Sequence, residues 1–291
     1  MAERCTLCPR RCGADRSLRM GFCGAGEEIR LARAMPHHWE EPCISGTGGS
    51  GTIFFSGCTL RCVFCQNRAI STENFGKAVS AERFREICFE LKAAGVHNIN
   101  LVSADAYAKQ IVPVLAEIKG ELGLPILLNS GGYLSPLQVE LFAQVVDIWL
   151  PDFKYADATL AAGLSGAEDY PRVALAAISQ MVQLAGKPRF DEQGILQSGV
   201  LVRHLVLPGH RKNSIEAIGR LADTFAPDEI LLSLMAQYTP NGAPGAPSRR
   251  ITGFEYRSVM EAVEAAGFAG YCQSPESAKS EYTPDFDLQG V

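Results

Sequence analysis

The chain has 291 residues, of which 47% are hydrophobic, which is enough for one large globular domain with a full core. Its 27 basic and 32 acidic residues give a net charge of −5, so the composition does not favour a protein that binds nucleic acid or an anionic membrane. No signal peptide or apolar run of membrane-spanning length is evident, which predicts a soluble cytoplasmic protein. In that compartment, ten cysteines indicate metal or redox chemistry rather than disulfides.

The first fifty residues contain little helical or strand periodicity. We expect residues 1–50 to form an irregular, cysteine-rich N-terminal extension and residues 51–291 to form the main domain. Four cysteines of this extension have the spacing of a four-thiolate site, namely Cys5, Cys8, Cys12 and Cys23. They predict a second metal site, either zinc or an iron–sulfur cluster, and the alternatives are reduced free thiols or an adventitious disulfide.

From Thr52 onward, short apolar runs alternate with segments of helical periodicity. Strands are predicted at 52–56, 98–102, 125–129, 147–150, 200–207 and 229–235, with a last one near 269–271. Helices are predicted near 80–95, 105–121, 135–145, 171–186, 212–224 and 253–266. This alternation indicates βαβ units, a parallel sheet and an α/β fold of the partial (β/α)6 barrel type.

Polar residues follow the predicted strands, where such barrels place their chemistry. They include Ser103, Asn129, Asp152, Lys154, His210 and Gln237. His204 alternates with Arg203 on one strand, so only one of these two side chains can face the barrel interior. We therefore expect His210, in the following loop, to be the better candidate for substrate contact.

Three cysteines lie within eight residues directly after the first barrel strand. Cys58, Cys62 and Cys65 can bind three corners of a [4Fe–4S] cluster, and no fourth cysteine or histidine occurs nearby. One iron would then remain open. The alternatives are structural zinc, which normally has four protein ligands, or unrelated core cysteines.

This spacing resembles the signature of the radical S-adenosylmethionine (SAM) superfamily. Further strings, such as residues 51–58, 150–155, 202–210 and 233–240, are similar to the uncharacterised PflX family, which is related to pyruvate formate-lyase activating enzymes. The resemblance implies a cluster whose open iron binds SAM and whose electron cleaves it to a 5′-deoxyadenosyl radical. It also implies that Phe64 borders the adenine.

The same resemblance implies several contacts to SAM. Asp152 and Lys154 match an Asp-x-Lys that reaches SAM, and Arg203 matches an arginine on the fifth strand. The alternatives are a solvated turn pair for the first two and a structural ion pair for Arg203. A Gly-Gly-Glu-Pro stretch, frequent in the superfamily, is replaced by Ser103-Ala-Asp105, so the backbone, Ser103 or Asp105 would substitute for it.

The remaining cysteines and histidines are expected to pack. Packing is favoured over a cluster or substrate contact for Cys43, a core position is predicted for Cys88 and Cys272, and a surface or packing role is favoured for His37 and His38.

Three functions remain open from the sequence. The first is a radical SAM enzyme that abstracts hydrogen from an unidentified small molecule or protein, with a low-potential donor of the flavodoxin or ferredoxin type. The second is a glycyl-radical enzyme activase, which is disfavoured because no ferredoxin-like insert follows Cys65. The third is a non-catalytic iron–sulfur or SAM-binding protein. In the first case, the N-terminal extension could cover the barrel mouth as a lid.

Overall fold

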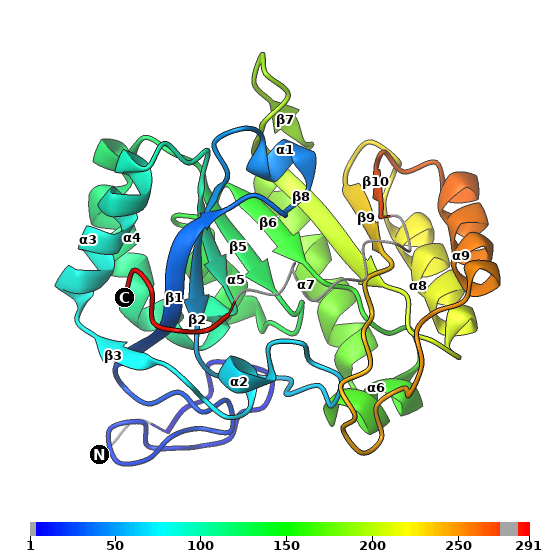
Figure 1. The fold of residues 1–291 in the computed structure, drawn as a ribbon, viewed down its shortest axis with the longest axis horizontal. Helices are drawn as coiled ribbons and strands as arrows, with labels where there is room; N and C mark the ends of the chain where they lie inside the picture. Colours follow the sequence, from blue (N-terminus) through cyan, green and yellow to red (C-terminus); the bar gives the residue numbers. More distant parts are fainter. Residues whose placement is uncertain (1–3, 274–284) are drawn as a thin grey trace.

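The computed structural model describes residues 4–273 and 285–291, and a single curved sheet forms its centre (Figure 1). The strand order is β10-β9-β8-β6-β5-β4-β2-β1-β3, and β7 pairs with β8 outside this path. The strands are β1 (Ile29–His37), β2 (Ser50–Phe55), β3 (Lys77–Val79), β4 (Ile99–Val102), β5 (Ile126–Ser130), β6 (Ile148–Pro151), β7 (Arg189–Phe190), β8 (Leu196–Leu205), β9 (Leu231–Met235) and β10 (Gly270–Cys272).

The helices lie mainly between consecutive parallel strands. They are α1 (Pro42–Ser45), α2 (Arg68–Ser71), α3 (Ala81–Ala93), the 3-10 turn η1 (Ala104–Tyr107), α4 (Ala108–Leu122), α5 (Pro136–Phe142), α6 (Ala158–Ser165), α7 (Tyr170–Ala185), α8 (Arg211–Thr224) and α9 (Gly253–Ala266). Ser135 and Thr252 begin α5 and α9 with capping boxes, in which the hydroxyl accepts the backbone N–H of the third helical residue and the side chain of that residue accepts the backbone N–H of the capping residue.

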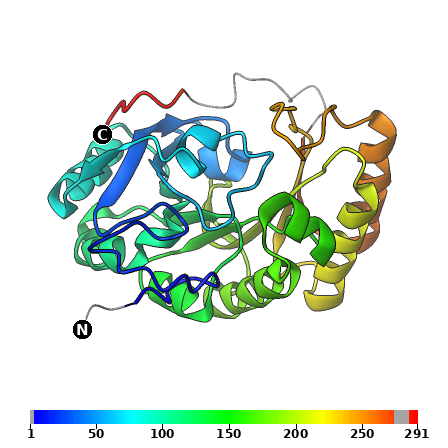
Figure 2. The same cartoon turned by 90° about the horizontal axis from the view of Figure 1, so that it is seen from below.

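The parallel part of the sheet confirms the predicted barrel type. β2, β4, β5, β6, β8, β9 and β10 follow one another in parallel pairs. The path ends at β10 on one side and at β3 on the other, so the barrel is partial. The helices form an arc along the outer face of the curved sheet (Figure 2).

The N-terminal extension is more regular than its sequence suggests. Residues 29–37 form β1, which pairs antiparallel with β2 over residues 50–55 and carries β3 at the sheet edge. The expectation of an irregular segment is therefore wrong for these residues, although residues 4–28 contain no helix and no named strand. The error arose because β1 is polar at several positions, where its side chains face the cavity or solvent.

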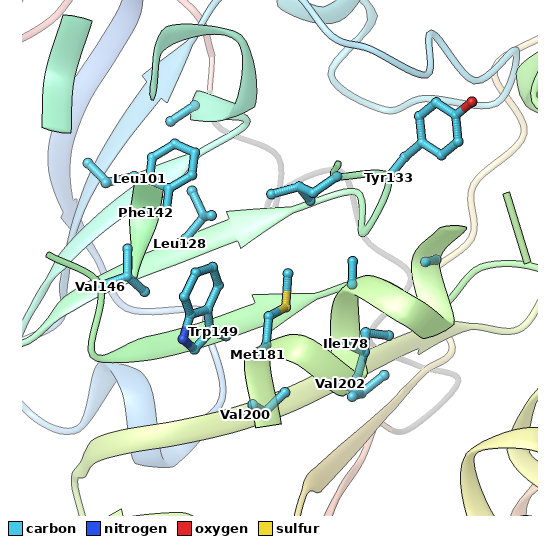
Figure 3. Packing of buried hydrophobic residues seen from close by; sticks show 14 of the residues in the cluster. Leu101, Leu128, Tyr133, Phe142, Val146, Trp149, Ile178, Met181, Val200 and Val202 are labelled. Atoms are coloured by element: carbon cyan, nitrogen blue, oxygen red, sulfur yellow. The ribbon is translucent and has the colours of Figure 1, made fainter. Parts of the chain in front are cut away.

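The outer face of the sheet packs against the helices and forms the main core. Trp149 of β6, Val200 of β8 and Leu128 of β5 project toward Phe142 of α5 and Met181 of α7 (Figure 3). Side chains at alternate positions point to the other face, because successive strand residues face opposite sides.

The inner face carries a second apolar layer. Leu127, Ile148, Leu150, Leu201 and Leu231 pack there against Cys43 and Ile44 of α1. Two residues further toward the carboxyl ends, the side chains on the same face include the polar Asn129, Arg203 and Ser233. This change from an apolar to a polar layer determines where the cavity begins.

In the described part of the chain, no helix has the length and apolar character needed to cross a membrane.

Candidate active site

A cavity of about 560 Å³ lies at the carboxyl ends of the parallel strands. The inner-face side chains that line it come from successive strands and include Phe54, Val102, Asn129, Arg203, Ser233 and Met235. The loops after the strands complete its wall. The cavity thus lies at the strand ends, where the sequence predicted the site.

The three-cysteine loop, residues 57–66, enters this cavity directly after β2. Cys58, Cys62 and Cys65 all line the cavity and are partly buried free thiols. The loop is anchored on two sides, since the Cys58 N–H donates to the Cys23 carbonyl (2.9 Å) and the Ser165 hydroxyl donates to the Cys62 sulfur (2.9 Å).

The chemistry of these thiols fits an iron–sulfur cluster. Burial raises the pKa of Cys58 to about 11 and also raises the pKa of Cys62 and Cys65. Buried thiolates therefore need a neighbouring positive charge, and iron ions supply it when they bind the sulfurs. The loop supplies thiols for only three of the four irons of a cubane cluster. The fourth iron has no cysteine from this loop, as a cluster that binds a substrate requires.

Phe64 lies at the cavity wall with 6% of its surface exposed. Its ring packs edge-on against Tyr155 and Tyr238, with centroid distances of 6.5 and 6.3 Å. The ring is thus fixed on one side and faces the cavity on the other, a position that suits contact with a planar base.

Asp152 and Lys154 follow β6 and form an ion pair at the cavity wall. Burial would lower the pKa of Lys154, but the Asp152 carboxylate outweighs it and the pKa of Lys154 is raised. The turn is held by Tyr170, whose hydroxyl lies 2.8 Å from the Asp152 carbonyl and 3.0 Å from the Lys154 N–H. The predicted alternative of a solvated turn pair is wrong, because the pair is largely buried.

Arg203 faces the cavity from β8, and its partners come from the other end of the chain. Its Nε donates to a Glu41 carboxylate oxygen (2.9 Å), and its Nη2 pairs with both Glu40 and Glu41. The three side chains are at most 11% exposed. The ion-pair alternative for Arg203 is therefore present in the structure, at a position that also borders the cavity.

Ser103 and Asp105 occupy the turn after β4. Ser103 has a left-handed backbone (φ 59°) and lines the cavity. Asp105 is buried, its Oδ1 has no hydrogen-bond partner, and burial raises its pKa to about 7. An unpartnered buried acid next to the cavity is consistent with a polar ligand group missing from the structure.

Several other residues differ from expectation. Cys272 is exposed and lines the cavity, so its predicted core position is wrong. His210 is the N-cap of α8 and is not among the residues that line the cavity, which removes the basis for substrate contact. His204 points away, with its Nδ1 2.6 Å from the Phe153 carbonyl. Cys43 and Cys88 are buried as predicted.

Sequence reasoning missed the residues between β1 and α1. His37, Trp39, Glu40 and Glu41 all line the cavity. None of residues 4–28 lines the cavity. The part of the N-terminal extension that borders the cavity, where a lid was expected, is therefore the short segment that contains Trp39, Glu40 and Glu41. The sequence offers paired carboxylates at Glu40 and Glu41, but nothing in it links them to Arg203, 162 positions beyond Glu41.

The second cysteine group, Cys5, Cys8, Cys12 and Cys23, lies in loops beside the three-cysteine loop (Figure 1). Within residues 4–273 and 285–291, no three His, Cys, Asp or Glu side chains are placed to hold one metal ion. This applies to both cysteine groups, and it concerns ligands that converge on a single ion rather than a cluster with one cysteine on each iron.

A partial parallel barrel with three cysteines after its first parallel strand, facing a polar cavity, defines an iron–sulfur enzyme of the barrel class. Residues 52–222, which make up more than half of the chain, match the family model of the Radical SAM superfamily. The chain belongs to this superfamily. It is a radical SAM enzyme, and its cofactors are a [4Fe–4S] cluster and SAM.

Two relatives match the chain, one over most of its length and one over about a quarter of it. The uncharacterized protein MJ0674 of Methanocaldococcus jannaschii is 29% identical over 275 residues, which cover 91% of this chain and 74% of that protein. The 3-methylornithine synthase of Methanosarcina acetivorans is 35% identical over 85 residues, which cover 27% of this chain and 24% of that enzyme.

Solved structures show the same fold. SuiB of Streptococcus suis bound to S-adenosylmethionine has a TM-score of 0.56 at 15% identity, covering 77% of this chain, and this chain spans only half of SuiB. Methylornithine synthase (PylB) has a TM-score of 0.52 at 17% identity, covering 82% of this chain and 78% of that enzyme. At these identities the likeness concerns the fold alone.

Proposed function

We propose that the protein is a PflX-type radical SAM enzyme that binds its [4Fe–4S] cluster through Cys58, Cys62 and Cys65 and abstracts hydrogen from a small molecule in the cavity. The observation that carries this proposal is that all three thiols line one cavity together with the polar side chains from the strand ends. When bound, the cluster supplies the electron that splits SAM into methionine and a 5′-deoxyadenosyl radical.

The chain's own residues orient SAM. Phe64 contacts the adenine, while the Asp152 and Lys154 pair and Asn129 offer charged and neutral partners to the amino acid and ribose groups. Ser103 and Asp105 take the place of the Gly-Gly-Glu-Pro stretch. The carboxyl of Asp105, which lacks a partner at Oδ1, is suited to accept the SAM ammonium group.

Arg203 completes this wall from β8. Because two carboxylates already neutralise its charge, its role is to shape the cavity and to contact a carboxylate or hydroxyl with its remaining N–H groups. Glu40 and Glu41 thereby act as positioning residues for Arg203.

A small substrate is favoured over a glycyl-radical protein. The connection from Cys65 to β4 contains only α2, β3 and α3, which leaves no ferredoxin-like insert. In addition, the segment from His37 to Pro42 and residues 270–273 narrow the cavity from two sides. A cavity narrowed in this way limits the access of water and oxygen to a reactive radical, which suits a small target.

Catalysis requires a reductant. We propose a low-potential flavodoxin or ferredoxin as its source, and the cytosol as the compartment in which the ten cysteines stay reduced.

The test uses reconstituted enzyme, SAM and dithionite, with separate small-molecule and protein fractions from an extract of the source organism. The fraction below 3 kDa is expected to stimulate 5′-deoxyadenosine formation, measured by mass spectrometry, and to contain a metabolite that is consumed. Stimulation by the protein fraction alone, together with a glycyl radical doublet in the electron paramagnetic resonance (EPR) spectrum, would instead establish the activase.

A further inference from the structure

The four-cysteine segment, residues 4–28, takes no part in the function proposed above. We propose that Cys5, Cys8, Cys12 and Cys23 bind a second iron–sulfur cluster through their thiolates and that this cluster fixes the three-cysteine loop. Soft thiolates suit such a cluster, in which each cysteine binds its own iron. A zinc ion instead needs ligands that converge on one point, and no such group is present among residues 4–273 and 285–291.

The backbone brings the four thiols together. Arg4 and Asp15 form an antiparallel bridge, and the Cys5 N–H donates to the Ala14 carbonyl (2.9 Å) while the Gly13 N–H donates to the Cys5 carbonyl (3.0 Å). Cys5 therefore lies opposite the residues that follow Cys12. Its thiol hydrogen-bonds with that of Cys12 and interacts electrostatically with Cys8 and Cys23.

Gly21 completes the arrangement. A Cβ at this glycine would lie 3.5 Å from the sulfur of Cys12 and 3.5 Å from the sulfur of Cys23, so both sulfurs lie against the same residue. All four cysteines are free thiols rather than disulfides. A cluster of four free thiols in one set of loops is the donor set of a structural metal site.

The segment has little else to hold it in place. It has no helix and no named strand, and its buried non-cysteine side chains are only Leu7, Ala14 and Ala25. Its larger apolar residues point outward, since Leu18 is 83% exposed and Met20 is 58% exposed. Ordering such a chain costs conformational entropy, and a cluster held by four ligands compensates this cost.

The segment is directly attached to the three-cysteine loop. The Cys23 carbonyl accepts the Cys58 N–H, and Gly57 (φ +89°) approaches so closely that a Cβ there would come within 2.4 Å of the same carbonyl oxygen. Arg10, between two of the four cysteines, donates to the carbonyls of Thr59 and Ser165 at 2.8 Å. A ligand of the second centre and a ligand of the SAM-binding cluster are thus joined by one hydrogen bond.

The experiment uses the full chain with Cys58, Cys62 and Cys65 all replaced by Ala, which cannot hold the SAM-binding cluster. Zinc, iron and sulfide are measured per chain, both as isolated and after anaerobic reconstitution. We expect iron and sulfide in about equal amounts, with the visible absorption of an iron–sulfur cluster. Adding Cys12→Ser should lower that content at least fivefold, whereas Cys272→Ser, which changes an equally exposed cysteine elsewhere, should not.

A second readout follows the fold of the segment. Trypsin should cleave after Arg10, Arg11, Arg16 and Arg19 at least tenfold faster in Cys12→Ser than in the unchanged chain. If the triple variant does not fold, the same comparison of metal content and cleavage is made between the wild type and Cys12→Ser. The proposal would be overturned by a chain that holds no iron–sulfur cluster or holds zinc in its place, or by equal cluster content and cleavage with and without Cys12, whatever the SAM chemistry shows.

Discussion

The buried ion pair between Arg203 and the glutamates before α1 offers a sharp test of the structure. Replacing Arg203 with Met keeps a long apolar side chain but leaves Glu40 and Glu41, at most 9% exposed, without their cation. Glu40 keeps one hydrogen bond, from Asn100 Nδ2 at 2.9 Å. Removing one partner of a buried pair costs about 3–5 kcal/mol, so the free energy of unfolding should fall by that amount at pH 7.

The pH dependence has a defined sign. Burial raises the pKa of Glu41, but the charge and hydrogen bond of Arg203, together with the Ser233 hydroxyl, outweigh burial, so the pKa of Glu41 is lowered. The pair therefore contributes stability above the ordinary glutamate pKa and loses it as the pH falls through the lowered one. The deficit of Arg203→Met should be largest near pH 7 and should shrink in acid, where both stranded carboxylates take up protons.

The assay is urea unfolding followed by tryptophan fluorescence, with Trp149 fully buried. The variant with Arg203→Met, Glu40→Gln and Glu41→Gln should recover part of the loss, because it removes the stranded charges. Arg85→Met, which breaks an exposed pair with Glu117, should leave the midpoint almost unchanged. An Arg203→Met variant with a wild-type midpoint would refute the reasoning and leave Arg203 as a SAM contact only.

Three further predictions concern the site. Asp105→Asn should stabilise the cofactor-free protein progressively from pH 4 to pH 8, by up to about 4 kcal/mol. Burial raises the pKa of Asp105 from 3.8 to about 7, so ionisation of this carboxyl group opposes folding. An advantage of the variant that does not change with pH would contradict this. Gly57→Ala should lower cluster content and thermal stability, because its Cβ would meet the Cys23 carbonyl. The control is Gly95→Ala, which has φ +80° and open space around it and therefore measures the backbone strain alone. Equal effects of the two variants would argue against the contact. Lys154→Met should raise the SAM concentration for half-maximal cleavage about tenfold or more, with Lys154→Arg retaining part of the affinity, and unchanged SAM dependence would remove Lys154 from the binding site.

The parallel half of the fold could be predicted from the sequence because its signals are local. Strands such as 98–102 and 125–129 are short apolar runs, and their order follows from the helices between them. The three-cysteine loop was equally accessible, since its ligands lie within eight residues. Strand 29–37 was not, because it carries Arg30, Arg33 and His37 among its apolar residues, so its periodicity is weak.

The parts of the site that escaped prediction depend on contacts between distant residues. Arg203 was expected to contact SAM, and the sequence could not show that Glu40 and Glu41, more than 160 positions away, would neutralise it. Cys272 follows an apolar strand and looked like a core residue, but it lies where β10 meets the cavity. In both cases the local pattern gives the side chain's chemistry, and the tertiary arrangement decides what it faces.

The central claim is that the thiols of Cys58, Cys62 and Cys65 hold a cluster with one iron open to SAM. Anaerobically reconstituted wild-type enzyme is reduced, and its EPR spectrum is recorded with and without SAM, beside the same measurement on Cys62→Ala and on Cys88→Ala as a buried-cysteine control. We predict a reduced [4Fe–4S] signal that shifts when SAM is added, with 5′-deoxyadenosine as a product, in the wild type and in Cys88→Ala only. A Cys62→Ala variant that keeps both the cluster and SAM cleavage would contradict the assignment.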